Sequence, residues 1–128
     1  IMEEFRGLLN MEVSEGKLLT LILCGLPELE DVIALDDPLK QRIAVKFKLS
    51  SFDLASTQEY IQHRLTVAGS EEEIFTAEAV KYVHVYSKGN PRLINTICDN
   101  ALFEGFMIKQ KPINRDIIDS VAASLDLQ

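Results

Sequence analysis

The period of hydrophobic and polar positions changes near residue 50, which divides the chain into two parts. From Leu18 to Cys24 the sequence LLTLILC is almost continuously apolar, and from Ile43 to Leu49 the sequence IAVKFKL alternates apolar and polar residues. The first pattern is typical of a strand covered on both faces, and the second is typical of a half-buried strand. The helical stretch PELEDVIAL lies between them, so residues 1–50 are predicted to be a strand–helix–strand piece of an α/β sheet.

After residue 50 the pattern has the period of helices. Four polar residues, each suited to accept a hydrogen bond at a helix start, precede four amphipathic stretches. They are Asp53, Thr76, Asn90 and Asn114. Residues 51–128 are therefore predicted to form a four-helix lobe without strands.

The amino-terminal part is expected to belong to a longer protein. Residues 2–11 have the spacing of a helix that is already under way, with Phe5, Leu8 and Leu9 on one face. Two strands do not make a stable sheet alone. The overall expectation is an α/β fragment followed by an all-α lobe.

Composition and charge narrow the classes of function. The 128 residues are 47% hydrophobic and 26% charged, which is globular, and the net charge is −7. Nucleic acids and anionic membrane surfaces require a basic face, so neither is an expected partner of this chain. No apolar run has the length of a membrane span. Cys24 and Cys98 lie in apolar runs, and we expect both to be buried thiols in a reducing cytoplasm.

Arg92 has an unusual position. If Asn90 is the N-cap and Pro91 the first helical residue, Arg92 is the second, where a cation opposes the helix dipole at a cost of ~0.3–1 kcal/mol. A bound anion would reverse this sign, because guanidinium and helix N–H groups suit phosphate. Gly89 and Pro91 would fix the backbone of the turn. The alternative is a solvated arginine that extends away from the helix.

Other candidate residues are weaker. Arg42 either offers a cation to a neighbouring subunit's phosphate or pairs with an acid such as Asp36 or Asp37. The turn after the first strand would place Leu26 where α/β proteins bind ligands, although leucine is apolar. No metal site is predicted. The phosphate-binding pattern GxxxxGK[ST] does not occur in the sequence, so the chain alone is not expected to hydrolyse a nucleotide.

Four stretches in this order, LILCGLPEL, LKQRI, YIQHRLTVAG and GNPRLINTICDNAL, resemble the general secretion pathway protein A type of AAA+ ATPase. The resemblance implies that residues 1–50 are the last part of the ATPase core, with the upstream Walker A and Walker B segments missing. It implies that residues 51–128 are the helical lid. Similar AAA+ proteins accompany some transposition systems.

The resemblance also implies roles for individual residues. Arg92 falls on the sensor-2 arginine, which contacts the γ-phosphate of ATP, and Arg42 resembles the arginine finger that completes a neighbouring subunit's site. Leu26 falls on the sensor-1 position, where relatives commonly carry glutamine, which puts positioning of the attacking water in doubt. Three residues would shape the sensor-2 turn and border the adenine: Gly89, Asn90 and Pro91.

For the intact protein the resemblance implies ATP and Mg²⁺ as ligands, a homo-oligomer, and protein partners in a secretion complex. It implies a cytoplasmic location, with an inner-membrane anchor in segments outside this chain. Two alternatives stay open: a transposition-associated ATPase, and a non-catalytic assembly module that keeps the lid fold.

Overall fold

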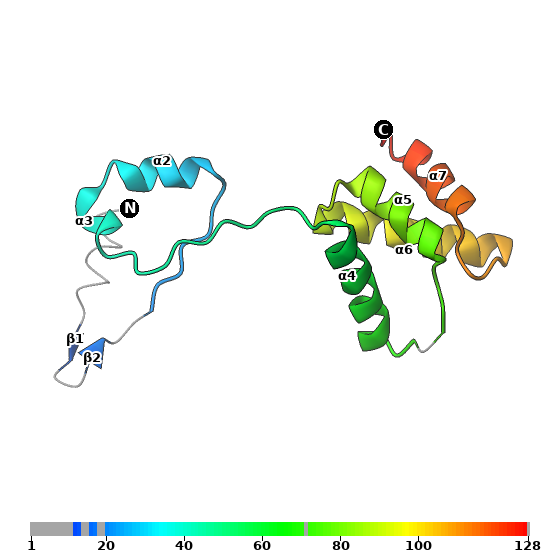
Figure 1. Cartoon of the computed structure of the whole chain (residues 1–128), viewed down its shortest axis with the longest axis horizontal. Helices are drawn as coiled ribbons and strands as arrows, with labels where there is room; N and C mark the ends of the chain where they lie inside the picture. Colours follow the sequence, from blue (N-terminus) through cyan, green and yellow to red (C-terminus); the bar gives the residue numbers. More distant parts are fainter. Residues whose placement is uncertain (1–11, 14–15, 18–19, 71, 128) are drawn as a thin grey trace. The chain divides into compact units, whose positions relative to one another are not determined.

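The computed structural model describes residues 12–13, 16–17, 20–70 and 72–127, so the helix expected over residues 2–11 lies outside the described part (Figure 1). The chain divides into two compact units, Ile1–Lys48 and Leu49–Gln128. The identity of the two parts as an ATPase core and a lid stays a prediction. None of the described helices combines the length and the apolar character needed to cross a membrane.

Among its described residues, the first unit has two short helices and one pair of two-residue strands. Strands β1 (Glu12–Val13) and β2 (Gly16–Lys17) pair antiparallel. Helix α2 (Glu28–Ala34) follows Pro27 and has three acidic residues in its first turn. Their negative charges interact favourably with the positive end of the helix dipole. Helix α3 (Asp37–Lys40) is a single turn. The helix predicted from PELEDVIAL is therefore confirmed, while the single turn begins earlier than the expected LKQR.

The two predicted sheet strands are wrong for the described residues. Residues 20–24 and 43–49 have no strand pairing, so an α/β fold is not confirmed. Ile22 is 78% exposed and Phe47 is 85% exposed. The apolar pattern in each run is local, but a strand exists only when a neighbouring backbone accepts and donates its hydrogen bonds, and two strands alone are marginal.

The second unit has four described helices, and the lobe predicted there is confirmed in its helices and its caps. They are α4 (Leu54–Val67), α5 (Ala77–Ser87), α6 (Pro91–Ile108) and α7 (Arg115–Ser124). The four predicted cap residues accept backbone N–H groups as expected, those of Ser56, Ala79, Arg92 with Leu93, and Ile117.

Helices α5, α6 and α7 pack on one another, and α4 crosses them steeply, as Figure 1 shows. Ile94 and Ile97 of α6, Val83 of α5 and Ile118 of α7 are each at most 1% exposed and form the centre of the core. Ile61 brings α4 to the same cluster. The helical period of the sequence therefore specifies which faces are buried.

One polar network joins α5 to α7. The Arg115 guanidinium lies 3.1 Å from the Asp119 carboxylate, 3.5 Å from that of Glu78, and 3.9 Å from the ring centre of Tyr82. The Tyr86 hydroxyl donates to the other oxygen of Asp119 at 2.8 Å, and this hydrogen bond raises the pKa of Tyr86. Arg115 is therefore an arginine whose charge is satisfied within the fold.

The two cysteines differ in environment, and the expectation of burial is wrong for Cys24. Cys24 is exposed, whereas Cys98 of α6 is partly buried against the core. Burial, followed by the nearby carboxylate of Asp99, raises the pKa of the Cys98 thiol to about 12. Thiolate is the reactive form of cysteine, so Cys98 carries almost no nucleophile at neutral pH.

We therefore predict that iodoacetamide at pH 8 alkylates Cys24 at least about tenfold faster than Cys98 in the folded protein, since reactivity follows thiolate fraction and access. Peptide mass spectrometry over a time course measures both rates in one sample. Denaturant should make the two rates similar. Equal rates under native conditions would contradict the environment described for Cys98.

Candidate functional site

The turn between α5 and α6 positions the candidate residue Arg92. Lys88 and Gly89 both have left-handed backbones, with φ of 51° and 72°. A Cβ at residue 89 would lie 1.9 Å from the carbonyl oxygen of Phe52, and the Phe52 N–H donates to the Gly89 carbonyl at 2.9 Å. Only glycine fits this approach, so the left-handed turn expected at Gly89 is confirmed.

The start of α6 leaves no backbone N–H available to a ligand. Asn90 accepts from the N–H groups of Arg92 at 2.9 Å and Leu93 at 3.5 Å through its side chain. Its carbonyl accepts from Ile94 at 2.9 Å, and Pro91 has no N–H. The expectation that free N–H groups join the guanidinium is therefore wrong, because the cap satisfies them. Any anion here would be held by side chains.

The Arg92 side chain is exposed and forms no ion pair within the described residues. The first turn of α6 contains no acidic residue. Arg115 also begins a helix, but its charge is matched by Asp119 and Glu78. Both arginines lie in the first turn of a helix, but only Arg92 keeps a guanidinium without a described carboxylate partner, which can bind an external anion.

The remaining candidates lie in the first unit. Arg42 follows α3, is exposed, and has no ion pair with a described residue, so the alternative of a pairing with a nearby acid is not seen among those residues. Leu26 is 76% exposed and its carbonyl accepts the N–H of Leu29 at 2.9 Å. The structure describes the two units separately, so it does not bring Arg42 or Leu26 together with Arg92.

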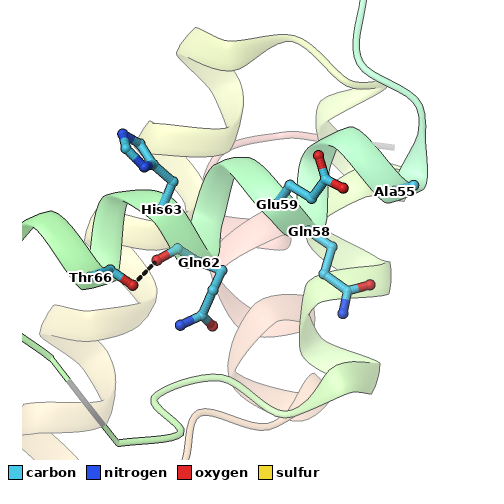
Figure 2. Close-up of a pocket in the computed structure, with 6 residues that line it drawn as sticks. All are labelled: Ala55, Gln58, Glu59, Gln62, His63 and Thr66. Carbon is cyan, nitrogen blue, oxygen red and sulfur yellow. Dashed lines mark hydrogen bonds between the residues drawn. The ribbon is translucent and has the colours of Figure 1, made fainter.

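The outer face of α4 carries a shallow hollow of about 600 Å³. Figure 2 shows its polar side chains along a single helix, with the Thr66 hydroxyl donating to the Gln62 carbonyl at 3.0 Å. His63 lies in this exposed row. None of the residues proposed from the sequence lines it, and the described chain has no group of three metal-ligating side chains.

Sequence reasoning missed the contacts that α4 makes near the turn. The Thr57 hydroxyl donates to the Asp53 carbonyl at 2.8 Å and lies 3.0 Å from Nδ1 of His84, which can then act as the donor. Asn95 accepts hydrogen bonds from Tyr60 and Arg64 of the same helix. The sequence shows that Tyr60 and Arg64 are four residues apart and so share a helix face. Their partner Asn95 lies 35 and 31 residues away, and no local pattern indicates it.

Comparison with known proteins gives one informative match. The chain is 41% identical over 108 residues to general secretion pathway protein A of Aeromonas hydrophila. The chain is a relative of general secretion pathway protein A. The match covers 83% of this chain and 20% of that protein, so the chain spans about a fifth of the length of the relative. No family model and no solved structure matches the chain.

The Phe52–Gly89 contact yields a prediction with a matched control. Gly69 is also left-handed, with φ of 83°, but a Cβ there would meet nothing within 4 Å. Gly69→Ala should cost ~1–2 kcal/mol of unfolding free energy from the backbone alone. Gly89→Ala should cost more than ~3 kcal/mol, above the usual range for single substitutions, because Phe52 must also move.

Urea denaturation of the two variants and the natural protein measures both costs. Equal costs for Gly69→Ala and Gly89→Ala would show that the Phe52 backbone does not lie against residue 89.

Proposed function

We propose that this chain is the carboxyl-terminal part of an AAA+ ATPase core with its helical lid, and that Arg92 contacts the γ-phosphate of ATP as the sensor-2 arginine. The observation that carries the proposal is the exposed Arg92 guanidinium on a fixed turn, without a carboxylate partner in the described chain. The similarity to general secretion pathway protein A supports the family on which this role depends.

The residues of the turn fit a phosphate in their chemistry. A guanidinium donates two parallel hydrogen bonds to phosphate oxygens and keeps its charge at every physiological pH. Gly89, Asn90 and Pro91 fix where α6 begins and thereby the base of the Arg92 side chain. ATP with Mg²⁺ supplies the phosphoryl group and its activating metal when bound. The chain's contribution is a positioned positive charge.

In the intact protein we propose a homo-oligomer in which Arg42 acts as the arginine finger of a neighbouring subunit. The exposed side chain of Arg42, with no described acidic partner, is compatible with that role. We further propose that nucleotide state is coupled to assembly or remodelling of a secretion-type complex in the cytoplasm. A position in such a complex comes from the relative's name alone.

The apolar side chain of Leu26 favours one alternative, a non-catalytic assembly module that keeps the lid. Relatives would use a polar group to orient water at this position, and leucine provides none. A transposition-associated ATPase is a second alternative, and the −7 charge argues that this chain would not itself bind the DNA.

The sensor-2 role predicts that Arg92→Ala in the full-length protein lowers ATP hydrolysis at least about tenfold, since a hydrogen bond to a charged group contributes roughly 1.5–3 kcal/mol. Arg92→Lys should retain part of the rate, because it keeps the charge but not the paired geometry. Steady-state phosphate release measures each rate. Lys81→Ala is the control, because Lys81 is an exposed cation on α5.

Turnover of Arg92→Ala equal to that of Lys81→Ala would contradict the sensor-2 role. A natural protein that neither binds nor hydrolyses ATP would instead favour the non-catalytic module.

A further inference from the structure

A cluster of polar side chains joins α4 to the beginning of α6. The Oδ1 atom of Asn95 accepts the Tyr60 hydroxyl at 3.1 Å and the Arg64 Nη1 at 3.3 Å. The same Arg64 nitrogen donates to the Tyr60 hydroxyl at 3.2 Å, and its guanidinium lies 6.0 Å from the Tyr60 ring centre. Three residues from two helices thus form a closed set of hydrogen bonds.

The same helix is fixed to the other side of the turn. Phe52 directly precedes the cap of α4, and its N–H donates to Gly89. The Phe52 ring lies 5.4 Å from that of Tyr60, centre to centre. Phe52 and helix α4 therefore contact the chain on both sides of Arg92, at Gly89 three residues before it and at Asn95 three residues after it.

Residues three apart on a helix are neighbours on its surface, so Asn95 lies beside Arg92. Thr96, one position on, donates to the carbonyl of Arg92 at 3.0 Å. A shift of α4 would therefore be transmitted through Asn95 to the helical turn from which the Arg92 side chain extends.

The hydrogen bonds of Tyr60, Arg64 and Asn95 are expected to add little to the free energy of unfolding. Arg64 is exposed, and it has no ion pair with a described carboxylate. The two hydrogen bonds from Arg64 are exposed and contribute little net free energy, because water replaces them on unfolding, whereas the Tyr60–Asn95 bond is partly buried. Orientation, in contrast, depends strongly on such contacts, since small misplacements at a reacting centre can be costly.

We propose that Tyr60, Arg64 and Asn95 are positioning residues that set the orientation of Arg92 towards the triphosphate, so that α4 and sensor 2 move as one body. This inference rests on the proposed function. Tyr60 and Arg64 do not contact the nucleotide in this proposal. They act only by orienting the Arg92 side chain.

The test is a double-mutant cycle in the full-length protein, with kcat and KM for ATP hydrolysis as the readout. Asn95→Ala should lower kcat about three- to tenfold, the factor allowed by one or two ordinary hydrogen bonds. In an Arg92→Ala background the same substitution should change kcat less than about 1.5-fold, because no side chain remains to be oriented. Tyr60→Phe, which deletes one hydroxyl, should give a smaller loss that also disappears in that background.

Asn100→Ala is the matched control on the same helix. Asn100 donates to the Thr96 carbonyl at 2.8 Å within α6 and makes no contact with α4 among the described hydrogen bonds. Its kcat should equal that of the natural protein. Thermal unfolding of every variant separates orientation from stability, because a structural role would lower the melting temperature equally in both backgrounds.

The outcomes distinguish the two proposals. A full loss from Asn95→Ala in the Arg92→Ala background, or no loss in the natural background, overturns the positioning role and leaves sensor 2 intact. No loss from Arg92→Ala itself overturns the proposed function, and this inference with it.

Discussion

The close approach of the Phe52 backbone to Gly89 is the constraint on which the second unit depends. The Phe52 carbonyl oxygen would lie 1.9 Å from a Cβ at residue 89, so only glycine fits there. The Phe52 N–H donates to the Gly89 carbonyl at 2.9 Å and holds the two segments together. This contact locks the start of α4 to the turn between α5 and α6. Helix α6, which carries Arg92, begins at Pro91, two residues after this contact.

Charge is distributed around this turn in an unusual way. Asn90 satisfies the helix start without a negative charge, so nothing in the cap neutralises the guanidinium two residues on. At the start of α7, in contrast, Arg115 is matched by two carboxylates and a tyrosine ring. The cost of a cation at the start of α6 is small, ~0.3–1 kcal/mol, so a fold can retain it for a ligand.

The sequence predicts local features well and long-range features poorly. Cap residues such as Thr76 and Asn114 act within three residues of their partners, so their roles could be predicted with the bounds of the helices. The run at residues 43–49 alternates correctly for a strand, but the partner strand it requires is absent from the described chain. The Tyr60–Asn95 contact spans 35 residues and follows only from packing of the whole lobe.

For the candidate site, too, the local features were predicted and the long-range contacts were not. Sequence reasoning found Arg92 because a cation opposes the dipole at a helix start, and it found Gly89 because glycine permits a left-handed turn. The cap role of Asn90 was predicted, but its consequence, that the helix N–H groups are already bonded, was not drawn. The contacts of Tyr60 and Arg64 with Asn95 depend on packing and could not be predicted. The relative supports the family, and the chain spans about a fifth of that protein's length.

A crystal structure of the full-length protein with Mg²⁺ and a non-hydrolysable ATP analogue tests the central claim most directly. The account predicts that the Arg92 guanidinium lies about 2.7–2.9 Å from oxygens of the γ-phosphate, the distance of a charge-assisted hydrogen bond. It also predicts that the bonds from Tyr60 and Arg64 to Asn95 stay intact. An Arg92 side chain directed into solvent beside a fully bound nucleotide would contradict the account.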